Sequence, residues 1–223
     1  MTGVYLEIGK RKVFACAGDW PGWARAGRGE DAALVALKDA APRFAVVCAR
    51  AGVPFDGPAA VASFEVVERV AGSATTDFGA LDACAGLDRE PLTGEDANRV
   101  AALVGAAWDA FGQAAGAAPP VLRKGPRGGG RDLDAIVDHV LQTEVLHARM
   151  LGLRHRPFPP GDTAAAARVR ADILAAIRAG EAPGQPRGPG RSRRPPRFVA
   201  RRTAWHALDH AWEIQDRQDP GLT

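Results

Sequence analysis

Two of the five histidines, His206 and His210, lie four residues apart in a helical pattern near the C-terminus. A helix turns by about 100° per residue, so this spacing places both imidazoles on one face, one turn apart. Such a pair can offer two ligands to one metal ion. Glu213 follows on the same face, and we expect Asp209 and Glu213 to accept hydrogen bonds from the ligating imidazoles. The alternative is a pair of hydrogen-bonded histidines without a metal.

A third ligand would have to come from another helix. The stretch predicted as helix over residues 132–151 carries His139, Glu144 and His147, and each can face the interior, although not all three can reach one ion. Three protein ligands plus a water molecule are typical of an open, catalytic metal site. His139, Glu144 and His147 are therefore the candidates for the third ligand.

The helices that would position these residues have apolar side chains at helical spacing. Thr93 and Asp96 have the spacing of a capping box at the start of the first helix. Residues 180–197 are rich in Arg, Pro and Gly and are expected to form a mobile loop. We therefore predict a four-helix bundle over residues 93–217, with helices at about 94–115, 132–151, 163–179 and 198–216.

The first 70 residues have a different pattern, which predicts a β-β-β-α-β unit. Strands are expected at 4–9, 13–17, 23–26 and 64–70, with one helix over 30–51. Residues 71–92 contain many Gly, Thr, Asp and Ala and are expected to be a linker. The predicted fold class is α+β, with a small N-terminal domain (1–70), a linker (71–92) and a bundle (93–217).

The N-terminal unit resembles the HicB-like antitoxin fold. The resemblance rests on a turn followed by a glycine and a helix start, namely Asp19-Trp20-Pro21-Gly22-Trp23, Gly27, and then Glu30, Ala33 and Leu34. The motif is mainly structural. It implies a β-β-β-α-β domain that binds a partner protein.

The bundle resembles the DinB-like superfamily of up-down-down-up four-helix bundles. The matching residues are Asp138-His139-Val140 with Glu144 on one helix, and the run from Ala204 to His210 on the last helix. The resemblance to mycothiol- and bacillithiol-dependent metalloenzymes implies ligation by His139, His206 and His210. It also implies a divalent metal such as zinc or nickel, and a low-molecular-weight thiol. The Arg/Pro/Gly insert before the last helix departs from the family pattern.

A glycine-rich basic loop precedes the second helix of the bundle. Arg123, Lys124, Arg127 and Arg131 flank its glycines, and exposed backbone N–H groups near a helix N-terminus can hold a phosphate or carboxylate. The alternative is a solvated connection. The arginines from Arg187 to Arg202 lack interleaved aromatic residues, so we expect a solvated loop rather than a nucleic-acid site.

Composition excludes several classes of protein. The net charge is only +3, and hydrophobic and charged residues make up 46% and 25% of the chain, as in ordinary globular proteins. The three cysteines form no CxxC motif, so the sequence has no zinc-finger or redox motif. No serine lies in a Gly-x-Ser-x-Gly elbow, which argues against a serine hydrolase. The sequence shows no membrane-spanning run and no signal peptide, so we expect a cytoplasmic protein.

Two hypotheses of function follow. The first is a metal-dependent hydrolase or thiol transferase that acts on a small molecule. In it, the metal lowers the pKa of a bound water molecule or of a bound thiol. The second is a non-catalytic interaction protein, whose HicB-like domain binds a partner protein while the bundle acts as a structural or dimerising module.

Overall fold

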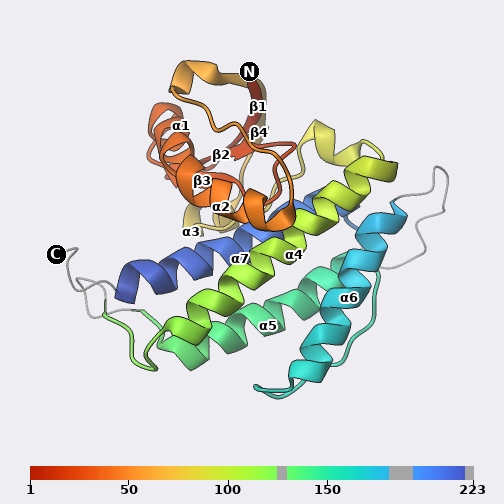
Figure 1. Ribbon diagram of the computed structural model, residues 1–223. Helices are drawn as coiled ribbons and strands as arrows, with labels where there is room; N and C mark the ends of the chain where they lie inside the picture. Colours follow the sequence, from red (N-terminus) through yellow and green to blue (C-terminus); the bar gives the residue numbers. More distant parts are fainter. Residues whose placement is uncertain (125–129, 181–192, 219–223) are drawn as a thin grey trace.

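The computed structural model describes residues 1–124, 130–180 and 193–218 and has a mixed α+β fold (Figure 1). A four-stranded sheet near the N-terminus is followed by helices, which confirms the predicted α+β class. Two of the predicted features, Arg127 of the basic loop and residues 181–192 of the Arg/Pro/Gly loop, lie outside the described residues. Among the helices in the described ranges, none is long and apolar enough to span a membrane.

The sheet has the strand order β3-β2-β1-β4. Strand β1 pairs antiparallel with β2 and parallel with β4, and β2 pairs antiparallel with β3. All five residues of β2 are buried, because helices cover both of its faces. The bounds are β1 (Thr2–Ile8), β2 (Val13–Ala17), β3 (Ala24–Gly27) and β4 (Phe64–Ala71), close to the four predicted strands.

The single helix predicted over residues 30–51 is wrong, because the structure has two helices there. Helix α1 (Glu30–Asp39) ends at Ala40, and α2 (Ala41–Ala51) begins directly after it. Pro42 explains the break: its ring nitrogen has no hydrogen to donate to the preceding turn, and proline is accepted only in the first turn of a helix.

The predicted linker over residues 71–92 contains ordered structure. It includes α3 (Ala74–Phe78), followed by the 3₁₀ helix η2 (Gly86–Arg89). Ser73 caps α3, and its hydroxyl accepts a hydrogen bond from the backbone N–H of Thr75. The polar residues that suggested a linker thus serve as caps and buried partners, as Asp88 of η2 does.

The remaining helices pack as a four-helix arrangement. They are α4 (Gly94–Ala117), α5 (Leu133–Met150), α6 (Thr163–Ala179) and α7 (Pro196–Gln218). Figure 1 shows α4 and α7 running in one direction and α5 and α6 in the other. Thr93 is the N-cap of α4, but its side chain makes no capping hydrogen bond, so the predicted capping box does not form.

Helix α7 lies between the bundle and the sheet. Trp205 packs edge-on against Phe14 of β2, with ring centroids 5.6 Å apart, so it contacts the sheet rather than a neighbouring helix. Arg201, on the same side of α7, is buried and hydrogen-bonds Asp88 and Tyr5. One face of α7 therefore belongs to the sheet, which leaves the opposite face to meet α5.

Candidate metal centre

Three histidines from two helices meet between α5 and α7. His139 comes from α5, and His206 and His210 come from α7. Each offers one ring nitrogen, and the three nitrogens lie within 4.8 Å of one another. The Nε2 atoms of His139 and His206 are 3.2 Å apart. The structure thus brings together the three residues that the sequence nominated as ligands, all of them partly buried.

The separation of these nitrogens fits a small divalent ion after a slight closure. Zinc–nitrogen bonds of about 2.0–2.1 Å in a tetrahedral site place two ligand nitrogens roughly 3.3 Å apart. The pair formed by His139 and His206 already has this separation. The third nitrogen needs to move inward by no more than about 1.5 Å, which side-chain rotation can supply.

His210 is oriented by a chain of charged groups. Its Nδ1 lies 2.8 Å from Oε2 of Glu213, and Nη1 of Arg217 donates to Oε1 of the same carboxylate at 2.8 Å. The Nε of Arg217 also donates to the backbone carbonyl of Arg123. With Nδ1 acting as donor to Glu213, the Nε2 of His210 keeps its lone pair available for a metal.

Burial keeps two of the imidazoles neutral. It lowers the pKa of His206 to about 2, with further lowering from the charges of His210 and His147. Burial likewise lowers the pKa of His139, and the charge of His210 adds to the effect. In contrast, the hydrogen bond from His210 lowers the pKa of Glu213, which therefore stays ionised. Neutral imidazoles beside an ionised acceptor are the protonation states that metal ligation requires.

His147, one competing ligand, lies beside the cluster but is engaged elsewhere. Its ring centroid is 5.9 Å from that of His206, and its Nδ1 is 3.1 Å from the hydroxyl of Thr203. The side chain is buried, and this burial lowers its pKa to about 3. His147 is therefore a neutral, buried side chain that packs beside His206.

Glu144, the other competitor, belongs to a separate ion pair. Both oxygens of its buried carboxylate accept hydrogen bonds from Arg170 of α6, at 2.8 and 2.9 Å. Burial raises the pKa of Glu144, while Arg170 opposes this rise. Since both oxygens are used by Arg170, Glu144 ties α5 to α6.

Asp209 and Glu213 have different partners, although the sequence suggested one role for both. Glu213 contacts His210, as described above. Asp209 instead accepts a hydrogen bond from Arg25 of β3 at 3.1 Å and links α7 to the sheet. Glu213 and Asp209 are separated by one helical turn, and only the former points at the cluster.

The described part of the basic loop makes contacts within the protein. The guanidinium of Arg123 donates to the carbonyl of Asp216 at 2.8 Å, and the ammonium of Lys124 contacts Asp132 at 2.6 Å. Arg131 is exposed, and its charge lowers the pKa of His139. The predicted anion-binding loop therefore has two of its cations paired with protein oxygens.

Two supporting residues were not assigned a role from the sequence. Arg217 anchors Glu213, and Thr203 holds His147. The first could have been found, because a glutamate and an arginine four residues apart face each other on a helix. The second contact joins α7 to α5 and has no local signal in the sequence.

No family model matches the chain, and neither the curated proteins nor the solved structures contain a match to it.

Proposed function

We propose that this chain is a DinB-like metalloprotein in which His139, His206 and His210 hold one divalent ion, zinc or nickel, and that it catalyses a hydrolysis or a thiol transfer. The observation that carries the proposal is the approach of three ring nitrogens from α5 and α7 to within 4.8 Å of one another. Three imidazoles suit zinc and nickel and leave a further coordination position for a water molecule or a thiol.

The chain's own residues would have distinct tasks in such a site. Glu213, itself held by Arg217, fixes the orientation of the His210 ring. His147 and Thr203 are buried beside His206 and exclude water from that side of its ring. When bound, the metal would supply the chemistry of a Lewis acid, lowering the pKa of the water or thiol that it holds.

The competing interpretation is a cluster of histidines without a metal. In that case His139 and His206 share one proton across the 3.2 Å between their Nε2 atoms, one ring donating and the other accepting. Such a pair leaves only the Nδ1 contact of His210 with Glu213 in use and gives its Nε2 no partner among the described residues. The metal interpretation uses all three rings and the Glu213 contact, which is why we favour it.

Metal content tests the binding half of the proposal. We expect the full chain, purified without a histidine tag, to hold about one zinc or nickel ion per chain by inductively coupled plasma mass spectrometry. His139→Ala and His206→Ala should each abolish stoichiometric binding. His155→Ala is the matched control, because His155 pairs with Asp172 outside the cluster, and it should retain the metal.

Thermal stability gives an independent readout of the same site. A ligand at a hundred times its dissociation constant stabilises the folded state by about 2.7 kcal/mol. Added zinc should therefore raise the melting temperature of the wild type and of His155→Ala, but not that of His206→Ala. A wild-type protein with neither bound metal nor a zinc-dependent shift would rule out the proposal.

Turnover tests the catalytic half separately. The metal-loaded protein should accelerate either hydrolysis of 4-nitrophenyl acetate or transfer of a low-molecular-weight thiol to 1-chloro-2,4-dinitrobenzene. A chelator, or His210→Ala, should remove the acceleration. If the protein binds metal but neither rate depends on it, the enzymatic part of the proposal is wrong while the metal site stands.

A further inference from the structure

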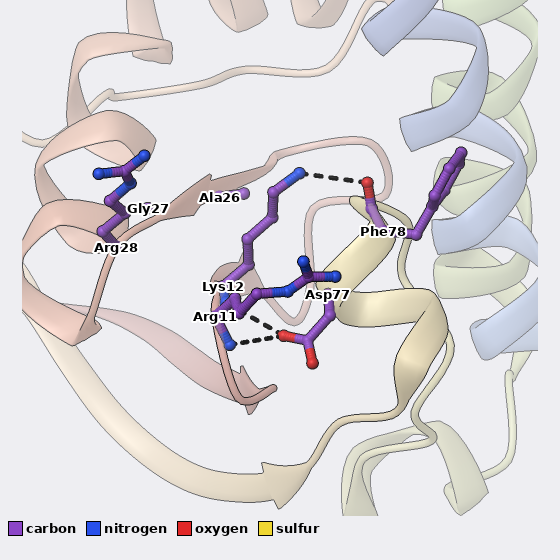
Figure 2. A pocket seen from close by; sticks show the side chains of 7 residues that line it. All are labelled: Arg11, Lys12, Ala26, Gly27, Arg28, Asp77 and Phe78. Atoms are coloured by element: carbon purple, nitrogen blue, oxygen red, sulfur yellow. Dashed lines mark hydrogen bonds between the residues drawn. The ribbon is translucent and has the colours of Figure 1, made fainter.

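The hollow of about 480 Å³ beside β3 does not form a second binding site, although basic residues line it. Figure 2 shows that these side chains point in different directions, so they do not meet at one anion; they are Arg11, Lys12 and Arg28. The ring of Phe78 is turned away from the hollow, on the side where α7 passes (Figure 2). What this side of the sheet offers a ligand lies instead where the end of α3 meets α7.

Arg202 of α7 lies at this meeting point, one turn before His206. Its Nη1 donates to the backbone carbonyl of Leu81, which follows α3. A spacing of four residues places Arg202 and His206 on one side of α7, with Cα atoms roughly 6 Å apart along the helix axis. The charge of Arg202 lowers the pKa of both His206 and His147. Arg202 thus brings a positive charge next to the candidate metal centre.

The guanidinium of Arg202 uses only part of its hydrogen-bonding capacity within the protein. Besides Leu81, its Nη1 contacts Oδ1 of Asp82 at 3.2 Å. Its Nε and Nη2 form no hydrogen bond with any residue that the structure describes. Burial lowers the pKa of Arg202 although the carboxylates of Asp82 and Glu7 act in the opposite direction, and the nearby charge of Arg194 adds to the lowering. The positive charge is therefore incompletely compensated by protein groups.

The unused edge of Arg202 has the geometry of a carboxylate binder. Elsewhere in this protein the same two nitrogens of Arg170, Nε and Nη2, hold both oxygens of the Glu144 carboxylate at 2.9 and 2.8 Å. Such paired, charge-assisted bonds are stronger and more specific than single ones. Arg202 leaves this edge without a protein partner in the described ranges, so the edge suits a carboxylate that comes from a ligand.

An apolar side chain lies across the seam from Arg202. Leu146 follows His139 by two turns of α5 on the same side of the helix, and it is 50% exposed. Helices α5 and α7 run in opposite directions, and His147 contacts Thr203. Their chain neighbours Leu146 and Arg202 therefore come to about the same level of the bundle. A ligand that reaches from the histidines to Arg202 passes a hydrocarbon surface.

We propose that the substrate of the metal centre is a small acyl compound with a carboxylate at the far end of a short hydrocarbon chain. The inference rests on the proposed function, since it names the substrate class of the same site. Nε and Nη2 of Arg202 bind the carboxylate, the chain passes Leu146, and the acyl group lies at the three histidines. Arg202 then determines specificity, because a substrate that ends in a methyl group leaves its edge unpaired.

Calorimetric titration of the zinc-loaded full chain with glutarate and valerate tests the proposal. The two acids have the same length and differ only in a second carboxylate in place of a methyl group. We expect glutarate to bind at least tenfold more tightly, with a smaller difference at high salt. A protein that holds zinc but binds both acids equally would overturn this inference alone. A protein that holds no zinc would overturn the proposed function together with it.

Variants of Arg202 locate the preference. Arg202→Gln should lower the affinity for glutarate to that for valerate, with zinc content and valerate binding unchanged. Arg178→Gln is the matched control, because Arg178 is exposed on α6, and it should keep the wild-type preference. Arg202→Lys keeps the charge beside Asp82 but lacks the paired edge, so it should lose at least threefold of the preference. Full preference in both Arg202 variants, or equal losses in Arg202→Gln and Arg178→Gln, would contradict the assignment.

A second pair of variants tests the path of the hydrocarbon chain. Leu146→Ser should weaken binding of both acids by about threefold and leave their ratio unchanged, because the contact is apolar. Val46→Ser, at another exposed apolar position on α2, should have no effect. If the two serine variants bind the acids equally well, the chain does not pass Leu146.

Discussion

Glu213 shows how one side chain can determine whether another is oriented to bind a metal. Its carboxylate holds His210 through Nδ1 and is itself held by Arg217, so the lone pair on Nε2 is aimed without an additional residue. Asp209, one turn away along α7, has the same charge but contacts Arg25. The two acids therefore provide a matched pair for a test.

Glu213→Gln should weaken zinc binding by about tenfold to a hundredfold, because the neutral amide is a poorer acceptor and loses its ionic contact with Arg217. Competition against a chromophoric chelator measures this affinity. Asp209→Asn changes an acid that does not contact a histidine, so its zinc affinity should equal that of the wild type. Equal loss in both variants would mean that nearby charge, rather than the Glu213 contact, controls affinity.

His147 makes the stability of the metal-free protein depend on pH. Burial lowers its pKa to about 3, whereas an unfolded histidine titrates near 6.5, so the unfolded chain binds more protons between these values. Stability is therefore lost as the pH falls below 6.5, by about 2 kcal/mol at pH 5 from this residue alone.

His147→Gln should remove this contribution. Urea unfolding in the presence of a chelator, at pH 7 and pH 5, gives the free energy of unfolding for each protein. The difference between the two pH values should be smaller in the variant by about 2 kcal/mol. The same pH dependence in the variant and the wild type would show that His147 is protonated in the folded state at pH 5.

At the scale of elements, β3 and α1 approach each other unusually closely. A Cβ atom added to Gly27 would overlap the backbone of Ala32 and Ala33, which cannot move without shifting the start of α1. Gly27→Ala should thus destabilise the protein by more than about 2 kcal/mol. Gly105→Ala is the control: its Cβ would meet nothing within 4 Å in α4, so we expect stabilisation by about 1 kcal/mol. Denaturant unfolding distinguishes these opposite signs, and a neutral Gly27→Ala would contradict the close approach.

The sequence predicted the long elements well, because periodic apolar residues report which face of a helix is buried. The four bundle helices and the four strands all occur near their predicted bounds. The break at Ala40 was missed because apolar spacing continues through it, although Pro42 carried the signal. The elements of residues 71–92 were missed because short caps and turns have no periodicity.

Spacing alone could nominate His206 and His210, whereas His139 was nominated by the resemblance to DinB-like bundles, and the hydrogen-bond partners of the three could not be predicted. Helical geometry places His206 and His210 on one face, and only the packing of α5 on α7 decides which residue of α5 lies opposite them. That packing excludes Glu144, since Arg170 from a third helix takes both of its oxygens. Long-range contacts of this kind leave no trace in local sequence.

At the scale of the whole molecule, a buried ion pair joins the sheet to the bundle. Arg201 of α7 donates from Nε to Asp88 at 2.8 Å and also contacts Tyr5 of β1.

Arg201→Met leaves the Asp88 carboxylate buried without its cation, and should lower the free energy of unfolding by about 3–5 kcal/mol. Adding Asp88→Asn should recover part of this loss, because the uncompensated charge is then gone. Chemical denaturation of the two single variants and the double variant measures the coupling. Additive losses would show that the two residues do not act as a pair.

Helix α7 is made late in translation but packs against strands that are made early. The sheet leaves the ribosome first, yet the face of β2 that carries Phe14 is covered by Trp205, and Tyr5 is matched by Arg201, nearly two hundred residues later. While the chain is being made, Leu81 and Ala85 can already pack on that face, but the part that Trp205 covers stays exposed. The N-terminal strands therefore reach their final packing only after α7 has emerged. Nascent chains halted before Trp205 should lack the native packing of both the sheet and the bundle.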